Sequence, residues 1–351
     1  MLYGTQNPHG GDVYTRPLKL DFSANINPLG TPNGVIQAVQ DSITQLSHYP
    51  DPYCRELIQA ISDFEGLPKE TILCGSGAAE LIFSYCAALH PRKALLLAPT
   101  FCEYQNALQA AGCETETYYL RAQDGFSLTE GFLQSLQTTD AELLLLCNPN
   151  NPTGLPIEQG LMEEILLLCK KRNIRLFVDE CFLDLTENGK AFSLTGKLAQ
   201  FPGLLILKAF TKSYGMAGLR LGYCLSADGD LLSAMSRQAQ PWNVSIPAQM
   251  AGAAALKETA FLEKACHVIH AERPRLLREL KRIELRPIPS KANFILFYSK
   301  QPLFSPLLEK GIQLRDCGNY PGLGPGWYRM AVKLPEENTQ LLKALEEILR
   351  G

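Results

Sequence analysis

The chain has 351 residues, of which 46% are hydrophobic and 20% are charged, and its formal net charge is −3. This ordinary globular balance is enough for two domains, or for one large core with an appendage, and it lacks the basic excess of a nucleic-acid-binding protein. No apolar run approaches the length of a membrane span, and "MLYGTQNPHGGD" at the N-terminus lacks the charged-then-apolar pattern of a signal peptide.

The first forty residues are rich in Pro, Gly and Asn and do not form a unit by themselves. We expect them to lie across a small domain or to reach a partner subunit. From about residue 70 to 226, apolar runs of strand length alternate with amphipathic stretches of helix length. The expected strands are 71–75, 93–99, 142–149, 174–180 and 204–210, and the helices between them are 78–90, 103–112 and 158–173.

The run at 142–149, "ELLLLCNP", shows no polar alternation, as expected for a strand that is buried on both faces. Strands of this kind alternating with helices predict a mostly parallel sheet covered by helices. The ligand of such a sheet is expected at the carboxyl ends of its strands.

After residue 250 the pattern changes and indicates a smaller α+β domain. A long helical stretch over 255–283 comes first. The expected strands that follow are 293–299, 312–317 and 327–333, and the expected helices are 305–311 and 338–350.

The eleven cysteines are scattered, several lie inside apolar runs, and none forms a CxxC pair. This usage is typical of free buried thiols in a reducing cytoplasm. His267 and His270 could share one helix face, but no third ligand is near them in the sequence, so we expect no metal site.

Polar groups follow several of the expected strands. Residues 74–80, "CGSGAAE", have the pattern of a strand, a glycine turn and a helix start, whose free amides attract phosphate; a plain tight turn is the alternative. Residues 148–154, "NPNNPTG", favour a rigid turn that presents the amide of Asn151, and a simple helix N-cap is the alternative.

Two further strand ends carry ionisable groups. Asp179 ends the run at 174–180, where a carboxylate needs a partner, such as the cationic ring nitrogen of a cofactor, or else serves as an N-cap. Lys212 follows the run at 204–210, and a lysine in a partly desolvated site has a lowered pKa and can form a Schiff base. Arg220 can hold a phosphate in a bidentate way.

These motifs, "NPNNPTG", "VDE" and "TKSYGMAGLRLGY", resemble those of the fold-type-I enzymes that use pyridoxal phosphate (PLP), in the same order and over essentially the whole chain. Within this family the chain is similar to histidinol-phosphate aminotransferases, and residues 9–30 and 315–333 resemble the threonine-phosphate decarboxylases of cobalamin synthesis. The resemblance implies an α/β fold with a large PLP-binding domain, residues 45–255, around a mostly parallel seven-stranded sheet between helices. Residues 1–44 with 256–351 would form the small α+β domain.

The resemblance also implies a role for each residue of a cofactor site. Lys212 would hold PLP as a Schiff base, and Asp179 would pair with the protonated pyridine nitrogen, which strengthens the ring as an electron sink. The other implied cofactor contacts are Asn151 to the phenolic oxygen, Phe101 stacked on the ring, Ser76, Gly77, Ala78, Thr211 and Arg220 to the phosphate, and Tyr49 to the phosphate of the other subunit.

The chain departs from the family pattern at two positions. Many relatives have a tyrosine where this chain has Phe182, so a second hydrogen bond to the phenolic oxygen is lost and the pKa of the Schiff base should be higher than in those relatives. Relatives usually have Ser or Thr where this chain has Ala209, which removes one expected phosphate contact.

For the substrate, the resemblance implies that Arg329 holds an anionic group and that Arg315 helps. Histidinol phosphate carries a phosphate only, whereas threonine phosphate carries a phosphate and a carboxylate and needs more donors. The sequence offers His9, the amides of Gly10 and Gly11, Asn27, Asn151 and Lys333. For His9 and Lys333 a solvated surface position is the alternative.

We therefore expect a homodimer with shared sites, acting on a small phosphorylated amino acid, with no nucleic-acid or membrane partner. The first hypothesis is decarboxylation of L-threonine 3-O-phosphate. The alternatives are transamination of histidinol phosphate with 2-oxoglutarate, and a non-catalytic PLP-fold binding or regulatory protein.

Overall fold

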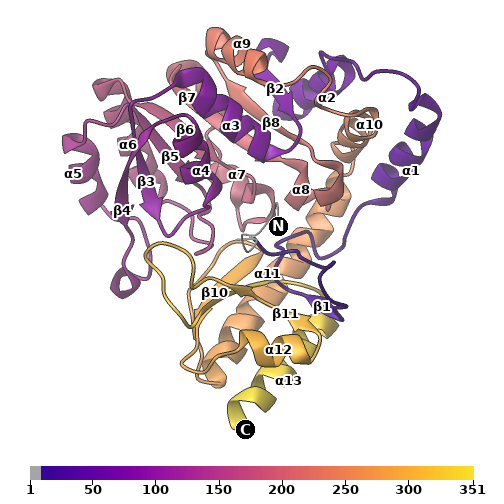
Figure 1. The fold of residues 1–351 in the computed structure, drawn as a ribbon, viewed down its shortest axis with the longest axis vertical. Coiled ribbons are helices and arrows are strands. Elements are labelled where there is room, and N and C mark those ends of the chain that lie inside the picture. The colour runs from indigo at the N-terminus through magenta and orange to yellow at the C-terminus, as the bar shows by residue number, and fades with distance from the viewer. Residues whose placement is uncertain (1–8) are drawn as a thin grey trace.

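A seven-stranded sheet is the largest sheet of the computed structural model, which describes residues 9–351 (Figure 1). Its strands, in order across the sheet, are β2 (Ile72–Gly75), β8 (Gly222–Ser226), β7 (Leu204–Ala209), β6 (Arg175–Asp179), β5 (Leu143–Cys147), β3 (Lys93–Ala98) and β4 (Glu114–Tyr119). Only β8 runs against its neighbours within this sheet; the other pairings are parallel. The predicted mostly parallel, seven-stranded sheet is confirmed.

The two faces of the sheet are covered by different sets of helices. Along β5, Leu144 and Leu146 belong to one core cluster, whereas Leu143, Leu145 and Cys147 belong to the other. This alternation is the two-residue period of a strand, and because every side chain of β5 is buried, both faces must be apolar. Helices of the first core are α2 (Arg55–Glu65), α5 (Gly131–Thr138), α6 (Gln159–Arg172) and α10 (Ile246–Ala255), and those of the second are α3 (Ala78–Leu89), α4 (Glu103–Ala110) and α9 (Gly229–Gln238).

The sequence pattern does not mark β4 and β8 as strands of this sheet. β4, "ETETYY", is an edge strand whose residues are partly or fully exposed, so it lacks the apolar run that marks the other strands. β8 is fully buried but follows directly on the glycine-containing stretch after Lys212. Two short helices, α7 (Gly189–Phe192) and α8 (Phe210–Ser213), follow β6 and β7.

The C-terminal third of the chain forms a second body, which lies below the large sheet in Figure 1. It has α11 (Thr259–Arg282), α12 (Phe304–Glu309), α13 (Pro335–Arg350) and an antiparallel sheet of β12 (Arg315–Asp316), β13 (Trp327–Ala331), β10 (Phe294–Tyr298) and β9 (Arg286–Pro287). The strand expected at 312–317 is divided: β11 (Ile312–Gln313) pairs with β1 (Leu20–Asp21), while β12 pairs with β13.

The N-terminal residues contact both bodies. Phe22, which follows β1, belongs to the core of the C-terminal body, together with residues such as Leu276 and Ile295. In contrast, α1 (Asn33–Ser42), which was predicted to belong to the small domain, packs on α10 of the predicted large domain. The division at residues 45 and 255 stays a prediction.

All eleven cysteines of the chain carry free thiols. Among residues 9–351, none of the helices combines the length and the apolar character that crossing a membrane would require.

Candidate active site

The carboxyl ends of three neighbouring parallel strands, β5, β6 and β7, open into one cavity of about 440 Å³. We call it the central cavity. The predicted site residues that line it are His9, Gly10, Ala78, Phe101, Asn151, Asp179, Thr211, Lys212, Arg220, Arg315 and Arg329. Phe182 and Ala209, at which the chain departs from the family pattern, line it as well. Residues more than 300 positions apart therefore meet where the arrangement of strands predicts a ligand.

Lys212 lies in α8, which begins as soon as β7 ends. Its amine is buried, and this desolvation, reinforced by the positive charge of Arg329, lowers its pKa to about 8. Nζ lies 5.7 Å from the centroid of the Phe182 ring. With a pKa of about 8, about a tenth of the amine is unprotonated at pH 7, far more than for an ordinary lysine, and the unprotonated form is the one that attacks a carbonyl carbon.

Asp179 is the last residue of β6 and is buried. Its Oδ2 accepts a hydrogen bond of 2.6 Å from the hydroxyl of Tyr104, and its Oδ1 accepts one of 2.8 Å from the amide of Cys181. Burial raises the pKa of Asp179, and these hydrogen bonds oppose part of that rise. A cationic ring nitrogen in the cavity would compensate the buried carboxylate further.

Tyr104 was not identified from the sequence. It lies on α4, three residues after Phe101, and its ring packs edge-on against that of Phe101. No sequence signal links it to Asp179, because the two are 75 residues apart and the contact exists only once α4 covers the sheet.

The turn at 148–154 uses two of its asparagines to hold its own shape. Asn148 Oδ1 accepts from the amide of Ile157 at 2.9 Å, and Asn150 Nδ2 donates to the carbonyl of Pro99 at 3.0 Å. Asn151 is the asparagine whose side chain lines the central cavity, and its Oδ1 accepts a hydrogen bond from Arg329 Nη1. The turn thus presents the amide that the sequence predicts.

The turn between β2 and α3 brings the cavity only part of the predicted phosphate contacts. The amide of Ser76 donates to Glu80 Oε2 at 2.5 Å, and the amide of Gly77 donates to the Gly75 carbonyl at 2.8 Å. Ala78, the first residue of α3, lines the cavity, whereas Ser76 and Gly77 do not. The roles of Ser76 and Gly77 stay predictions.

Gly77 has a structural reason to be glycine. Its φ is +84° and its ψ is 161°, a region that other residues rarely adopt. A Cβ atom on it would also lie only 2.5 Å from Arg220 Nη2. The missing side chain lets the Arg220 guanidinium approach the N-terminus of α3, where positive charge and free amides favour an anion.

Arg329 and Arg315 come from adjacent strands, β13 and β12, and occupy paired positions in the register. Both are buried and both line the central cavity. Arg329 Nη2 donates to the carbonyl of Ser23 at 2.9 Å, but its Nε is buried with no hydrogen-bond partner among the described residues. Arg315 Nη2 donates to Asn319 Oδ1 at 2.7 Å. The two guanidinium groups bring positive charge to one wall of the cavity.

The N-terminal segment contributes Asn25 rather than the predicted Asn27. Asn25 is 2% exposed, lines the cavity, and both polar atoms of its side chain lack partners among the described residues. Asn27 lies outside the lining, since its Nδ2 donates to the Ser213 carbonyl at 2.7 Å and its Oδ1 accepts from the amide of Leu29 at 2.9 Å. Nothing in "SANINP" distinguishes the two asparagines. Only the folded structure shows that Asn25 lines the cavity and that Asn27 hydrogen-bonds to α8.

His9 and Gly10 line the cavity, whereas Gly11 does not. The amide of Gly11 donates to Ser23 Oγ at 2.7 Å. Hydrogen bonds to Cys102 and Glu103 raise the pKa of His9 to about 9, so its ring is positively charged at neutral pH. The contact with Glu103 joins His9 Nε2 to Oε1 at 2.8 Å.

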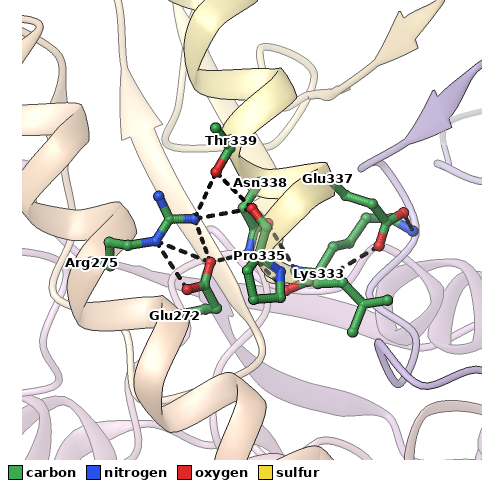
Figure 2. Close-up of polar contacts among 8 residues, drawn as sticks. Glu272, Arg275, Lys333, Pro335, Glu337, Asn338 and Thr339 are labelled. Carbon is green, nitrogen blue, oxygen red and sulfur yellow. Dashed lines mark hydrogen bonds and ion pairs between the residues drawn. The ribbon is translucent and has the colours of Figure 1, made fainter.

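Lys333 is not brought to the central cavity. Figure 2 shows its side chain beside Glu337 at the start of α13, with Nζ 3.2 Å from Glu337 Oε1. The same figure shows Asn338 donating to Glu272 on α11, at 2.8 Å, so this cluster joins two helices. Lys333 is partly buried, so neither its predicted contact with the substrate nor the alternative of a solvated surface position describes it.

Tyr49 also lies outside the lining. It is 78% exposed, and its ring stacks on that of Trp242 with the centroids 4.5 Å apart. Its predicted role concerns the site of a second subunit and stays a prediction.

The residues of the central cavity fit PLP on structural grounds. A buried amine of lowered pKa, a buried carboxylate, an aromatic ring and an arginine at a helix N-terminus are the groups that its aldehyde, its pyridine nitrogen, its ring face and its phosphate need. They are Lys212, Asp179, Phe101 and Arg220.

The chain is similar to known proteins over most of its length. The family model "Aminotransferase class I and II" matches residues 17–345. The chain is 39% identical over 336 residues to a threonine-phosphate decarboxylase of Salmonella typhimurium, covering 95% of this chain and 92% of that protein. It is 34% identical over 342 residues to a histidinol-phosphate aminotransferase of Desulfitobacterium hafniense, covering 94% and 91%.

Among solved structures, the chain is similar to a histidinol-phosphate aminotransferase from Sinorhizobium meliloti in complex with pyridoxal-5'-phosphate. The TM-score is 0.85 and the sequence identity is 23%, with 96% of this chain and 92% of that chain covered. This likeness shows that the fold is shared.

Proposed function

The chain belongs to the class I and II aminotransferase family, a family of PLP-dependent enzymes, and from this premise we propose that it decarboxylates L-threonine 3-O-phosphate. The proposed products are (R)-1-amino-2-propanol phosphate and CO2, the former being a precursor of the linker of the cobalamin nucleotide loop. The proposal goes beyond family membership because it selects one reaction and one substrate.

The observation that supports it most is the paired placement of Arg315 and Arg329 beside Lys212. Threonine phosphate brings a carboxylate and a phosphate into the cavity, and each anion must find a cationic or hydrogen-bonding partner once it leaves water. The two guanidinium groups on β12 and β13, together with the charged ring of His9, supply partners for both. Histidinol phosphate would bring a single anion, whereas the 2-oxoglutarate that its transamination needs would bring two carboxylates. The 39% identity to a threonine-phosphate decarboxylase supports the same substrate.

PLP, when bound, withdraws electrons from the amino-acid Cα. Asp179 would hold the proton on the pyridine nitrogen, so that the ring could take up the electron pair that the departing CO2 leaves behind, and Arg315 and Arg329 would hold the two anions of the substrate. Lys212 Nζ would then donate the proton that replaces the carboxylate on Cα. The amine of Lys212 carries such a proton readily because its pKa of about 8 lies close to neutral pH.

The experiment is a CO2-release assay with the purified holoenzyme, threonine phosphate and no 2-oxo acid. The parent should release CO2. Arg329→Ala should lower kcat/KM by roughly 30- to 4000-fold, because losing a buried charged partner typically costs about 2–5 kcal/mol. Arg278→Ala is the matched control, since Arg278 is exposed on α11, and it should retain the parent activity.

A second candidate, transamination of histidinol phosphate, is favoured by the 34% identity to a histidinol-phosphate aminotransferase. It is tested in the same samples with histidinol phosphate and 2-oxoglutarate. Formation of glutamate there, with no CO2 from threonine phosphate, would overturn the proposed decarboxylation in favour of this reaction.

A further inference from the structure

Three side chains of the types that bind metal ions meet at the wall of the central cavity. They are His9 from the N-terminal segment, Cys102 at the start of α4, and Glu103, the first residue of that helix. Their candidate ligand atoms all lie within 4.8 Å of one another. We propose that His9, Cys102 and Glu103 form a binding site for one thiophilic divalent cation of the Zn²⁺ type.

The distances suit a common metal ion after small side-chain rotations. His9 Nε2 is 2.8 Å from Glu103 Oε1, and Cys102 Sγ is 3.7 Å from the same oxygen. The other ring nitrogen, His9 Nδ1, is 4.0 Å from Sγ, and one ion would use only one of the two nitrogens. Ligand atoms on one tetrahedral Zn²⁺, with bonds of about 2.0–2.3 Å, are about 3.3–3.8 Å apart. The three candidate ligand atoms, one from each residue, lie within 4.8 Å of one another, so side-chain rotations of this size could bring them to one ion.

The ligand set selects the class of ion. Imidazole, thiolate and carboxylate are the three groups that bind Zn²⁺ in proteins, and three protein ligands leave one tetrahedral position for water or another oxygen. Binding would displace the proton that His9 shares with Glu103 and the proton of the Cys102 thiol, both of which go to solvent. Mg²⁺ and Ca²⁺ prefer oxygen ligands and would not use the thiol. A site with one sulfur, one nitrogen and one oxygen ligand therefore favours Zn²⁺ or Cd²⁺.

The ordinary alternative is a charge-assisted hydrogen bond between His9 and Glu103 with a cysteine beside it. The position of the thiol argues for more than that. Nine of the eleven cysteines are buried, and only Cys102 and Cys266 are partly exposed. Cys102 is thus one of two thiols that a dissolved ion can reach, and it has an imidazole and a carboxylate within reach.

An ion bound at this site would affect the binding of substrate in the central cavity. His9 and Glu103 both line the central cavity, so an ion bound to them stands at its wall. It would also take His9 away from the substrate anions that this residue is proposed to contact. This inhibitory consequence rests on the proposed function, whereas the binding of the ion does not.

The test uses Cd²⁺ as the probe, because a cadmium–thiolate bond absorbs in the ultraviolet and reports a sulfur ligand directly. Titration of the holoenzyme should give one such band that saturates at one ion per chain, and Zn²⁺ should displace it. Cys102→Ser should abolish the band. His9→Gln and Glu103→Gln should each weaken the apparent affinity by at least about tenfold. Cys266→Ser, which removes the other partly exposed thiol, should leave the titration unchanged.

Circular dichroism and thermal unfolding of each variant would show that it is folded. An unchanged band in Cys102→Ser, its loss in Cys266→Ser, or no band with Cd²⁺ in large excess would overturn the site. Because the titration needs no turnover, its result is independent of whether threonine phosphate is the substrate.

Discussion

Lys212 combines two properties that a lysine rarely has together: an amine removed from water at the wall of a cavity and a pKa lowered to about 8. Desolvation disfavours the charged form, and the guanidinium groups of Arg329 and Arg220 disfavour it further. The carboxylate of Asp179 acts in the opposite direction but is outweighed. Two predictions follow from the charges of these residues.

The first concerns attachment of the cofactor. When the apoprotein is mixed with PLP and reduced with borohydride, mass spectrometry should find the reduced cofactor on Lys212. The rate of attachment should rise as the pH increases through about 8, because only the unprotonated amine attacks the aldehyde. Lys212→Ala is the control and should carry no reduced cofactor. Label on Lys170, Lys171 or Lys208 in the parent would contradict the assignment.

The second concerns Asp179→Asn. The amide can still accept hydrogen bonds but has no charge, so the pyridine nitrogen loses its proton. The loss of one charge-assisted hydrogen bond, about 1.5–3 kcal/mol, predicts a decrease of roughly 10- to 150-fold in kcat. Asp124→Asn, an exposed aspartate, is the control and should keep full activity. Activity of the Asp179 variant within a few-fold of the parent would show that this residue is only a structural cap.

At the scale of elements, the site depends on how strand ends and helix starts are held. The start of α3 illustrates this, because Gly77 gives the chain a conformation and a space that no side chain allows. Gly77→Ala should weaken PLP binding, since the strained backbone alone costs on the order of 1–3 kcal/mol and the added methyl group would displace Arg220.

The measurement for Gly77→Ala is the dissociation constant of PLP from the apoprotein. Gly196→Ala is the matched control: Gly196 has nothing within 4 Å of the added Cβ, so its affinity for PLP should not change. Equal PLP affinity for Gly77→Ala and the parent would show that Arg220 does not need this space.

The ends of β6 and β7 and of helix α2 are joined by a buried charge cluster. Lys208 Nζ on β7 is 3.5 Å from Glu65 at the end of α2 and 3.4 Å from Glu180, which follows β6. Although burial lowers the pKa of Lys208, the attraction of Glu180, Asp184 and Glu65 raises it above its ordinary value. The lysine is therefore a permanent cation between carboxylates.

Lys208→Met should leave these carboxylates without their buried counterion and lower the free energy of unfolding by about 3–5 kcal/mol. Chemical denaturation measures this loss. Lys170→Met, at an exposed position of α6, serves as the control and should change the same quantity by no more than about 0.5 kcal/mol. A loss at Lys208 as small as the control would mean that solvent screens the cluster.

At the scale of the whole molecule, the segment around Tyr49 leaves large apolar side chains in water. Those exposed in this region are Ile43, Leu46, Tyr49, Tyr53 and, stacked on Tyr49, Trp242. Exposed apolar groups of this number mark surfaces that other proteins cover. The predicted partner is a second copy of the chain, with Tyr49 reaching the cofactor phosphate of that copy.

Subunit complementation tests this prediction. Tyr49→Phe should weaken PLP binding by roughly 10- to 150-fold, the effect of one hydrogen bond to a charged group. After subunit exchange with Lys212→Ala, mixed dimers should contain one site with both residues intact, and activity should return. A mixture of Asp179→Asn and Lys212→Ala is the control, since neither of its mixed sites is repaired. A fully active monomer in sedimentation would refute the shared site.

The sequence by itself determined five of the seven strands of the large sheet and the chemistry at their ends. Unbroken apolar runs such as 143–147 require burial on both faces, and where they alternate with helical stretches they predict parallel strands under helices. Asp179 and Lys212 were identifiable because a charged residue at the end of such a run must have a partner or a function. The order of these motifs was enough to indicate the PLP family.

Only the tertiary structure decided which neighbours complete the site. The edge strand β4 is half-polar, and the segment at 312–317 is divided between two sheets. Neither segment therefore shows the pattern of apolar residues from which its pairing could be predicted. Asn25 and Tyr104 reach the cavity, and Asn27 and Lys333 do not, through contacts between residues far apart in the chain. Local sequence governs backbone preference and burial, but the direction of a side chain toward a cavity depends on packing that joins distant segments.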